Sequence, residues 1–175
     1  LHVRELVAKK DASGATPSGF TKVTVTIPPL QGAGAGDFPL SALVSEKFKL
    51  LFLFTKLGVL YVFDVQTGTL LWHGQVSSST IFATAAHKAT DGVLGVNTQG
   101  SVLSFSIDEA ALLPYVLTQL RNSDLAYSIA SRCALPGAAD LFLAQFERLF
   151  AAAEYSAAAK VVAEAPEDTL RQPAT

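Results

Sequence analysis

Side chains that could bind a metal or act as an acid or base are scattered along this chain. His2, His73 and His87 lie far apart, and none has a second ligand at the short spacing that zinc sites use. Each histidine is therefore interpreted as a surface or turn residue. Asp108 and Glu109 precede a predicted helix, where carboxylates pair with the positive end of the helix dipole. These residues predict neither a metal site nor an acid–base centre.

Candidate nucleophiles and nucleotide-binding loops have equally simple interpretations. Residues 77–80 (SSST) lack a Gly-x-Ser-x-Gly context and a partner histidine, so they predict a loop. Cys133 cannot form an internal disulfide and is interpreted as a small apolar packing residue on a helix. Residues 31–36 (QGAGAG) lack the Lys-Ser/Thr ending of a phosphate-binding loop and predict a flexible connection. We expect no enzyme, no catalytic residue and no cofactor.

Composition narrows the class of protein further. The chain has 175 residues, of which 50% are hydrophobic and 16% charged, enough apolar material for a core and too little charge for disorder. The net charge of -2 leaves no broad basic surface for nucleic acid or anionic lipid. Apolar runs such as residues 50–54 are far shorter than the roughly 20 residues that a membrane span needs. We expect a folded protein that binds no nucleic acid and does not cross the membrane.

The two ends of the chain and its methionine and cysteine content indicate whether it is part of a longer protein and which redox compartment it occupies. No methionine is present, the first residues already have a strand pattern without the features of a signal peptide, and residues 169–175 are polar. These features predict a piece of a longer protein. A single cysteine fits a reducing, cytoplasmic compartment.

The elements that must position any site change character near Asp108. Before it, short apolar runs alternate with Gly, Asn and Asp turns, which is typical of antiparallel strands. Residues 8–19 and 31–36 predict loops, and strands are predicted at 1–7, 20–27, 38–45, 50–55, 59–65, 70–76, 80–85, 92–96 and 101–107. The four strands at 38–76 predict one propeller blade, and those at 80–107 predict three strands of the next. Residues 1–108 are therefore predicted to be a partial β-propeller of about two blades.

The second predicted blade lacks its outer strand. A propeller closes its ring when the first strand of the chain completes the last blade. We therefore expect the outer strand to come from a more N-terminal part of the full-length protein. Without it, the blade would expose an apolar edge.

After Asp108 the apolar spacing becomes helical. Helices are predicted at 112–120, 125–135, 138–153 and 155–165, with Pro114 in the first turn of the first helix and residues 122–124 capping the second. The third helix is predicted to have one apolar face, made of Leu141, Phe142, Phe146, Leu149 and Phe150. On that interpretation Phe146→Asp would unfold the helical half. Short helices in pairs are typical of solenoids, so residues 109–175 are predicted to be the start of an α-helical linker.

The order of these elements predicts an all-β part followed by an all-α part. Strands that lead directly into stacked helix pairs indicate a β-propeller continuing into an α-solenoid, an architecture of coats and scaffolds rather than of compact enzymes.

The chain also resembles a known family, the clathrin heavy chains. The resemblance covers nearly its whole length in one order and rests on DFP at 37–39, TKLG at 55–58, DVQTGT at 64–69, TIFATAAH at 80–87, GVLGVN at 92–97, GSVLS at 100–104, LPY at 113–115, SDLA at 123–126, residues 146–150, YSAAAKVV at 155–162 and AP at 165–166. It is weakest at residues 8–21, and the loop before Asp37 is longer than is typical of the family.

This resemblance implies the last blades of a seven-bladed N-terminal propeller and the start of an α-zigzag linker. It implies a structural, non-enzymatic coat protein of clathrin-coated pits and vesicles, acting in endocytosis and intracellular protein transport. The expected partners are adaptor proteins, through short peptide motifs, which hold the coat at the cytoplasmic face of the plasma membrane and trans-Golgi network. The main adaptor groove, light-chain binding and trimerisation lie outside this chain, so no family binding residue is assigned here.

Three alternatives stay open. Residues 63–72 (FDVQTGTLLW) resemble the repeat of quinoprotein dehydrogenases, in which the Asp and Gly shape a turn and the Trp packs between blades. The motif occurs once, so Trp72 is interpreted as an ordinary packing residue. A coatomer-like or tethering scaffold would share the same order of elements. The chain is also compatible with a partial gene model or a truncated gene copy.

Overall fold

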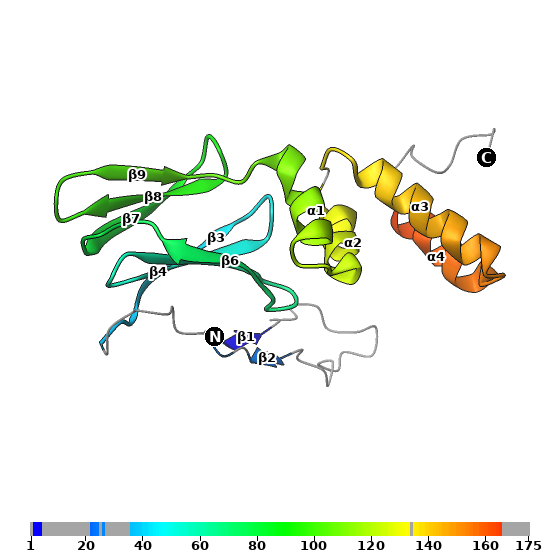
Figure 1. The fold of residues 1–175 in the computed structure, drawn as a ribbon, viewed down its shortest axis with the longest axis horizontal. Helices are drawn as coiled ribbons and strands as arrows, with labels where there is room; N and C mark the ends of the chain where they lie inside the picture. The colour runs from blue at the N-terminus through cyan, green and yellow to red at the C-terminus, as the bar shows by residue number, and fades with distance from the viewer. Residues whose placement is uncertain (1, 5–21, 25, 27–35, 134, 166–175) are drawn as a thin grey trace, which may run out of the picture. The chain divides into compact units, whose positions relative to one another are not determined.

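The computed structural model describes residues 2–4, 22–24, 26, 36–133 and 135–165. Contacts within the chain divide it into two units, Leu1–Ser106 and Ile107–Thr175. The first unit contains strands β1 to β9 and the second contains helices α1 to α4 (Figure 1). The loop predicted at residues 8–19 lies outside the described residues, as does most of that at 31–36.

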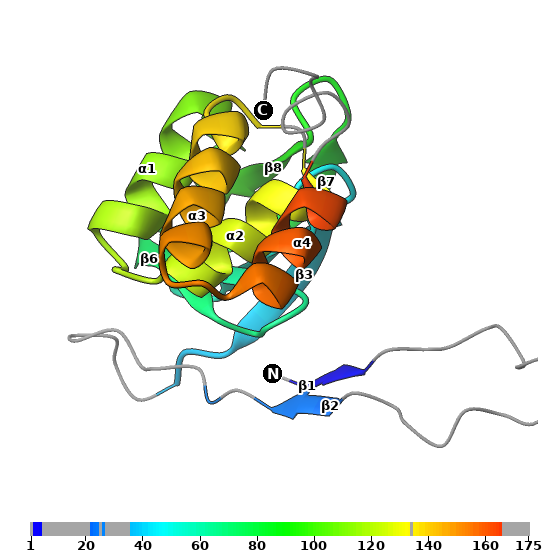
Figure 2. The ribbon, with the colours of Figure 1, turned by 90° about the vertical axis from the view of Figure 1, so that its right-hand side faces the viewer.

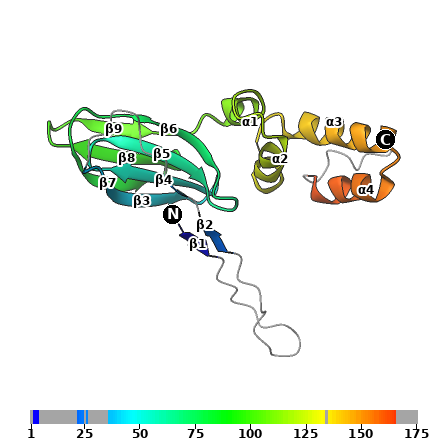
Figure 3. The ribbon, with the colours of Figure 1, turned by 60° about the horizontal axis from the view of Figure 1, so that its bottom comes forward.

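The first large sheet has the four strands that the sequence predicts. Strands β3 (Pro39–Ser45), β4 (Leu50–Thr55), β5 (Val59–Asp64) and β6 (Leu70–Gln75) pair antiparallel in chain order (Figure 3). Gly58 and Gly68 lie in the hairpin turns with φ of 79° and 70°, a left-handed conformation that glycine adopts without steric cost. The expected meander of four strands is therefore confirmed.

The second large sheet repeats the first at an interval of 42 residues. Strands β7 (Ile81–His87), β8 (Gly92–Asn97) and β9 (Val102–Phe105) also pair antiparallel in chain order. The first residues of β3 and β7 are 39 and 81, and those of β4 and β8 are 50 and 92. Even the strained turn residues correspond, because Lys49 and Asp91 both have positive φ, 54° and 49°. This interval is in the range of about 40–45 residues that separates propeller blades.

The second sheet ends at β9. Among the described residues no strand pairs with the outer edge of β9, and Val102 on this strand is 67% exposed. Leu60, which lies 42 residues earlier on β5, is buried. That the missing strand comes from the N-terminus of a longer protein stays a prediction.

A small third sheet joins β1 (His2–Arg4) to β2 (Lys22–Thr24) in an antiparallel pair, with Val3 opposite Val23. The strands predicted at 1–7 and 20–27 are thus confirmed at these residues.

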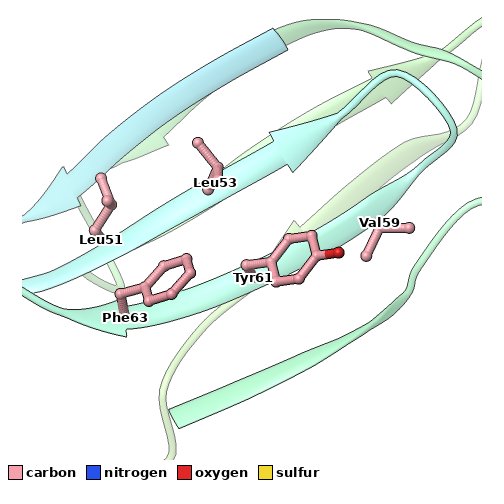
Figure 4. Packing of buried hydrophobic residues seen from close by; sticks show 5 residues of the cluster. All are labelled: Leu51, Leu53, Val59, Tyr61 and Phe63. Carbon is pink, nitrogen blue, oxygen red and sulfur yellow. The ribbon is translucent and has the colours of Figure 1, made fainter. Parts of the chain in front are cut away.

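Both faces of the central strands are buried. Every residue of β4 and β5 is buried, and Leu51, Leu53, Val59, Tyr61 and Phe63 form a cluster on one face of the two strands (Figure 4). The opposite face is directed at the second sheet, where the ring of Phe54 lies 5.7 Å from that of Phe105. The two sheets therefore stack face to face, as neighbouring propeller blades do (Figures 1 and 3).

The helical unit consists of α1 (Glu109–Thr118), α2 (Ser123–Arg132), α3 (Ala138–Ala151) and α4 (Tyr155–Glu164), with α3 and α4 side by side (Figure 2). The side chain of Asp108 accepts hydrogen bonds from the backbone N–H groups of Ala110 and Ala111. The side chain of Asn122 accepts one from Leu125. Both are N-cap contacts that satisfy helix donors, so the predicted roles of Asp108 and of the cap before α2 are confirmed.

Two details of the helical prediction are wrong. Because Asp108 caps the first helix, α1 begins three residues earlier than predicted, and Pro114 lies inside it instead of in its first turn. Pro114 therefore leaves the carbonyl of Ala110 without its usual i+4 donor. The second helix ends at Arg132, so Cys133 follows the helix in extended conformation, where it is buried.

The apolar face predicted for α3 is narrower than expected. Phe142 is fully buried, and its ring centroid lies 4.5 Å from that of Tyr127 on α2. Phe146 is only half-buried, and Phe150 is 55% exposed and contacts Tyr155 edge to face. Of the five residues predicted for this face, Phe142 is the one that is fully buried.

We expect Phe142→Ala to destabilise the helical unit by about 3–5 kcal/mol, because it removes a buried ring and leaves a cavity. Phe150→Ala, at an exposed position of the same helix, should cost less than about 1 kcal/mol. Urea unfolding followed by the helical circular dichroism signal measures both values. Equal losses for the two variants would contradict the assigned packing.

Candidate functional site

His73 and His87 are held in local structural contacts. The ring of His73 stacks on Tyr61 at a centroid distance of 5.6 Å, and Nδ1 of His87 lies 2.8 Å from Oγ1 of Thr90. Within the described part of the chain, no group of three or more His, Cys, Asp or Glu side chains could hold a metal ion.

The hydroxyl of Ser77 forms hydrogen bonds that connect two loops. Its Oγ donates to the carbonyl of Ser79 at 2.7 Å and accepts from Nδ2 of Asn97 at 3.2 Å. Oδ1 of Asn97 in turn accepts from the backbone N–H groups of Gln99 and Ser101. Ser77 and Asn97, both buried, therefore tie the β6–β7 connection to the β8–β9 hairpin. This linking role of Asn97 was not predictable from the sequence, because a hairpin asparagine has no distinctive spacing.

The segment that resembles a quinoprotein repeat forms a turn. Oδ2 of Asp64 accepts from the backbone N–H and the hydroxyl of Thr67, both at 2.7 Å. The ring of Trp72 lies over Gly74, so close that a Cβ on this glycine would be 2.7 Å from the ring. Trp72 is 41% exposed, so it packs along its own strand as a partly buried aromatic residue.

A groove lies between the two large sheets, at the start of their first strands. Its volume is about 450 Å³. Strands β3 and β7 supply most of its lining, which consists of Phe38, Leu40, Ser41, Lys56, Thr80, Ile81, Phe82 and Thr84. We call it the inter-blade groove. Four of its eight lining residues are large apolar ones, a composition typical of sites that bind ligands by side-chain burial.

A β-bulge on each side shapes this groove. The register of β3 against β4 shifts between Pro39 and Ser41, so Leu40 is the extra residue. The register of β7 against β8 shifts between Ile81 and Ala83, so Phe82 is the extra residue, 42 positions after Leu40. Bulges re-aim side chains and recur next to functional sites. Here they leave Leu40 44% and Phe82 64% exposed at the groove.

The polar groups of the inter-blade groove are few. Nζ of Lys56 lies 5.3 Å from the centroid of the Phe38 ring, within the range of a cation–π contact. Ser41 Oγ and Thr84 Oγ1 form a hydrogen bond of 2.5 Å that joins the two sheets. Among the described lining residues Lys56 carries the formal charge, so the groove is apolar with one positive group.

The opposite end of the same seam differs in character. A second hollow of about 390 Å³ lies there, lined by Val44, Ser45, Glu46, Ala86, His87, Lys88, Asp91 and Gly92. Acidic and basic side chains are mixed in it, so it offers no single charge preference. The inter-blade groove is therefore the better candidate for a ligand. None of its residues was predicted from the sequence to form a binding site, because neither bulge is visible before the strand register is known.

No helix in the described ranges combines the length and the apolar character that crossing a membrane requires.

Stacked sheets that repeat every 42 residues, followed by short helix hairpins, define a protein in which propeller blades lead into a helical linker. Three family models agree with this class: the clathrin propeller repeat at residues 74–108, the clathrin heavy-chain linker at 109–132 and Clathrin-H-link at 134–175. The chain belongs to the clathrin heavy chain family, as its sequence pattern indicated.

Relatives from distant organisms match over the same range. A probable clathrin heavy chain 1 of Caenorhabditis elegans is 45% identical over all 175 residues, and the clathrin heavy chain of Drosophila melanogaster is 42% identical over all 175. Clathrin heavy chain 2 of Homo sapiens is 38% identical over 171 residues, 98% of this chain. The chain spans about 10% of the length of each relative.

We expect Asn97→Ala to destabilise the strand unit by about 1–3 kcal/mol, because the change leaves buried hydrogen-bonding groups without their partner. Gln99→Ala, two residues away on the exposed turn, should change the stability by no more than about 0.5 kcal/mol. Urea unfolding followed by the intrinsic fluorescence of Trp72 reports on this unit. Stability unchanged in Asn97→Ala would show that Asn97 does not hold the two loops together.

Proposed function

We propose that this chain is a segment of a structural coat protein of clathrin-coated pits and vesicles, which supports endocytosis and intracellular protein transport. In this proposal residues 1–108 are the last blades, about two, of a seven-bladed propeller, and residues 109–175 begin the helical linker. Family membership and the order of strands and helices support this assignment.

The inter-blade groove supplies the observation that carries a binding role. Its exposed Leu40 and Phe82 project from equivalent bulges, and Lys56 adds one positive charge. An extended peptide with apolar side chains and a nearby carboxylate would complement these residues in shape and charge. We propose that adaptor proteins supply such peptides, in addition to those that bind the main groove outside this chain.

A coat can use contacts of this kind even when each is weak. When many copies of a protein are joined in one lattice, later binding events occur at the high effective concentration set by the first. The helical unit would contribute as part of a semi-rigid rod, since its helices pack on their chain neighbours in series. Light-chain binding and trimerisation would belong to the rest of a full-length heavy chain.

The proposed location follows from the proposed partners. Adaptors would hold the protein at the cytoplasmic face of coated pits and vesicles, at the plasma membrane and the trans-Golgi network. We propose no catalytic activity, because His73, Ser77 and Asp64 are engaged in turn and packing contacts.

We expect Phe82→Asp to weaken binding of a fluorescein-labelled peptide of alternating leucine and aspartate by about tenfold or more, because it puts a negative charge on the apolar wall of the groove. Fluorescence anisotropy measures the dissociation constant. The matched control is Phe150→Asp, which makes the same change at an exposed phenylalanine of the helical unit and should leave binding unchanged. Equal affinities for both variants would rule out the groove as the binding site.

A further inference from the structure

The hydroxyl pair inside the inter-blade groove has a proton to donate. Ser41 Oγ and Thr84 Oγ1 lie 2.5 Å apart, and either can be the donor. Each hydroxyl carries one proton and two lone pairs, and the bond between them uses only one of the two protons. The pair therefore keeps one O–H donor for another acceptor, whichever way the shared bond points.

This donor lies in the groove beside the apolar residues Leu40 and Phe82. Ser41 and Thr84 are half-buried, whereas Leu40, next to Ser41 on β3, and Phe82, two residues before Thr84 on β7, are exposed. A ligand whose side chain packs against Leu40 and Phe82 would bring its backbone or side-chain polar groups to the hydroxyl pair. Polar groups that are shielded from water by a ligand must find a partner, so the remaining proton favours a ligand with an acceptor at that point.

The chemistry of the groove favours a backbone carbonyl as this acceptor. Lys56 is the charged group among the described lining residues, and it lies over the Phe38 ring. A ligand carboxylate would therefore pair with Lys56, leaving a neutral acceptor for the hydroxyls. Extended peptides present a carbonyl at every residue, on alternating sides of the chain.

We propose that the Ser41–Thr84 pair donates a hydrogen bond to a backbone carbonyl of an extended peptide bound in the inter-blade groove, and so sets the register of that peptide against Leu40 and Phe82. This inference rests on the proposed function, since it assigns a positioning role within the same groove. The occupant is an extended segment of a partner protein that carries apolar side chains and a carboxylate.

Three variants of the chain test this role with the leucine–aspartate peptide as probe. The double variant Ser41→Ala/Thr84→Val removes both hydroxyls, because either one alone would still have a proton to donate, and it should weaken binding about threefold to tenfold. Thr84→Ser retains the hydroxyl and should bind within about twofold of the unchanged chain. Thr80→Val is the matched control, because Thr80 also lines the groove but is not part of the pair.

A modified peptide separates a direct contact from a structural effect. Replacing one backbone amide of the probe at a time with an ester weakens the neighbouring carbonyl as an acceptor. We expect one such peptide to lose affinity for the unchanged chain and for Thr80→Val but to lose none for Ser41→Ala/Thr84→Val. A purely structural role for the two hydroxyls would give the same ester effect in all three proteins.

The outcomes distinguish this inference from the proposed function. If Phe82→Asp abolishes binding while Ser41→Ala/Thr84→Val binds normally, the groove binds the peptide but the hydroxyl pair does not position it, and the inference is wrong. If the unchanged chain does not bind the probe, or Phe82→Asp has no effect, the peptide-binding function fails and the inference with it. Melting temperatures equal to that of the unchanged chain show that each variant is folded.

Discussion

The strand unit depends on the burial of both faces of its central strands. All twelve residues of β4 and β5 are buried, including Phe52, Phe54 and Phe63. A sheet whose two faces are apolar cannot stand alone in water, because either face left exposed would lose the free energy gained by burying it. The first large sheet therefore needs a neighbour on each face. The Phe54–Phe105 contact shows how the second sheet meets this requirement on one side.

The groove is a consequence of the same constraint. Sheets that repeat every 42 residues bring equivalent strands together, so β3 and β7 lie along one seam with their bulges at the same end. At a bulge one strand has one more residue than its partner strand, and at Leu40 and Phe82 the extra side chain is turned away from the packed face. Leu40 and Phe82 are both exposed where the two bulged strands meet. The bulge of a single blade forms no groove by itself. When two blades stack, the exposed side chains of the two bulges line a groove between them.

Local signals in the sequence were sufficient for the strands but not for the site. Gly58 and Gly68 mark turns, and the apolar runs between them fix strands β4 to β6 to within a residue. The bulges at Leu40 and Phe82 were not predictable, because they depend on the pairing register and not on residue type. Pro114 was misplaced for a similar reason: the start of α1 is set by the cap of Asp108, which competes with the preference of proline for a first turn. On α3, helical spacing indicated five apolar residues, but only contacts with α2 select Phe142 as the buried one.

The groove's chemistry favours reversible binding over strong binding. It offers a few apolar contacts, one positive charge at Lys56 and one hydroxyl proton, within about 450 Å³. Association also has an entropic cost, so a site of this size leaves a modest net affinity for a flexible peptide. For the proposed coat function, modest affinity is consistent with assembly by many parallel contacts. Any one peptide can then dissociate quickly. The adaptors still remain bound to the lattice, because other peptides stay bound while the first one rebinds. A deeper or more polar groove would bind one peptide longer, but it would make the assembly depend on single strong contacts instead of on their number.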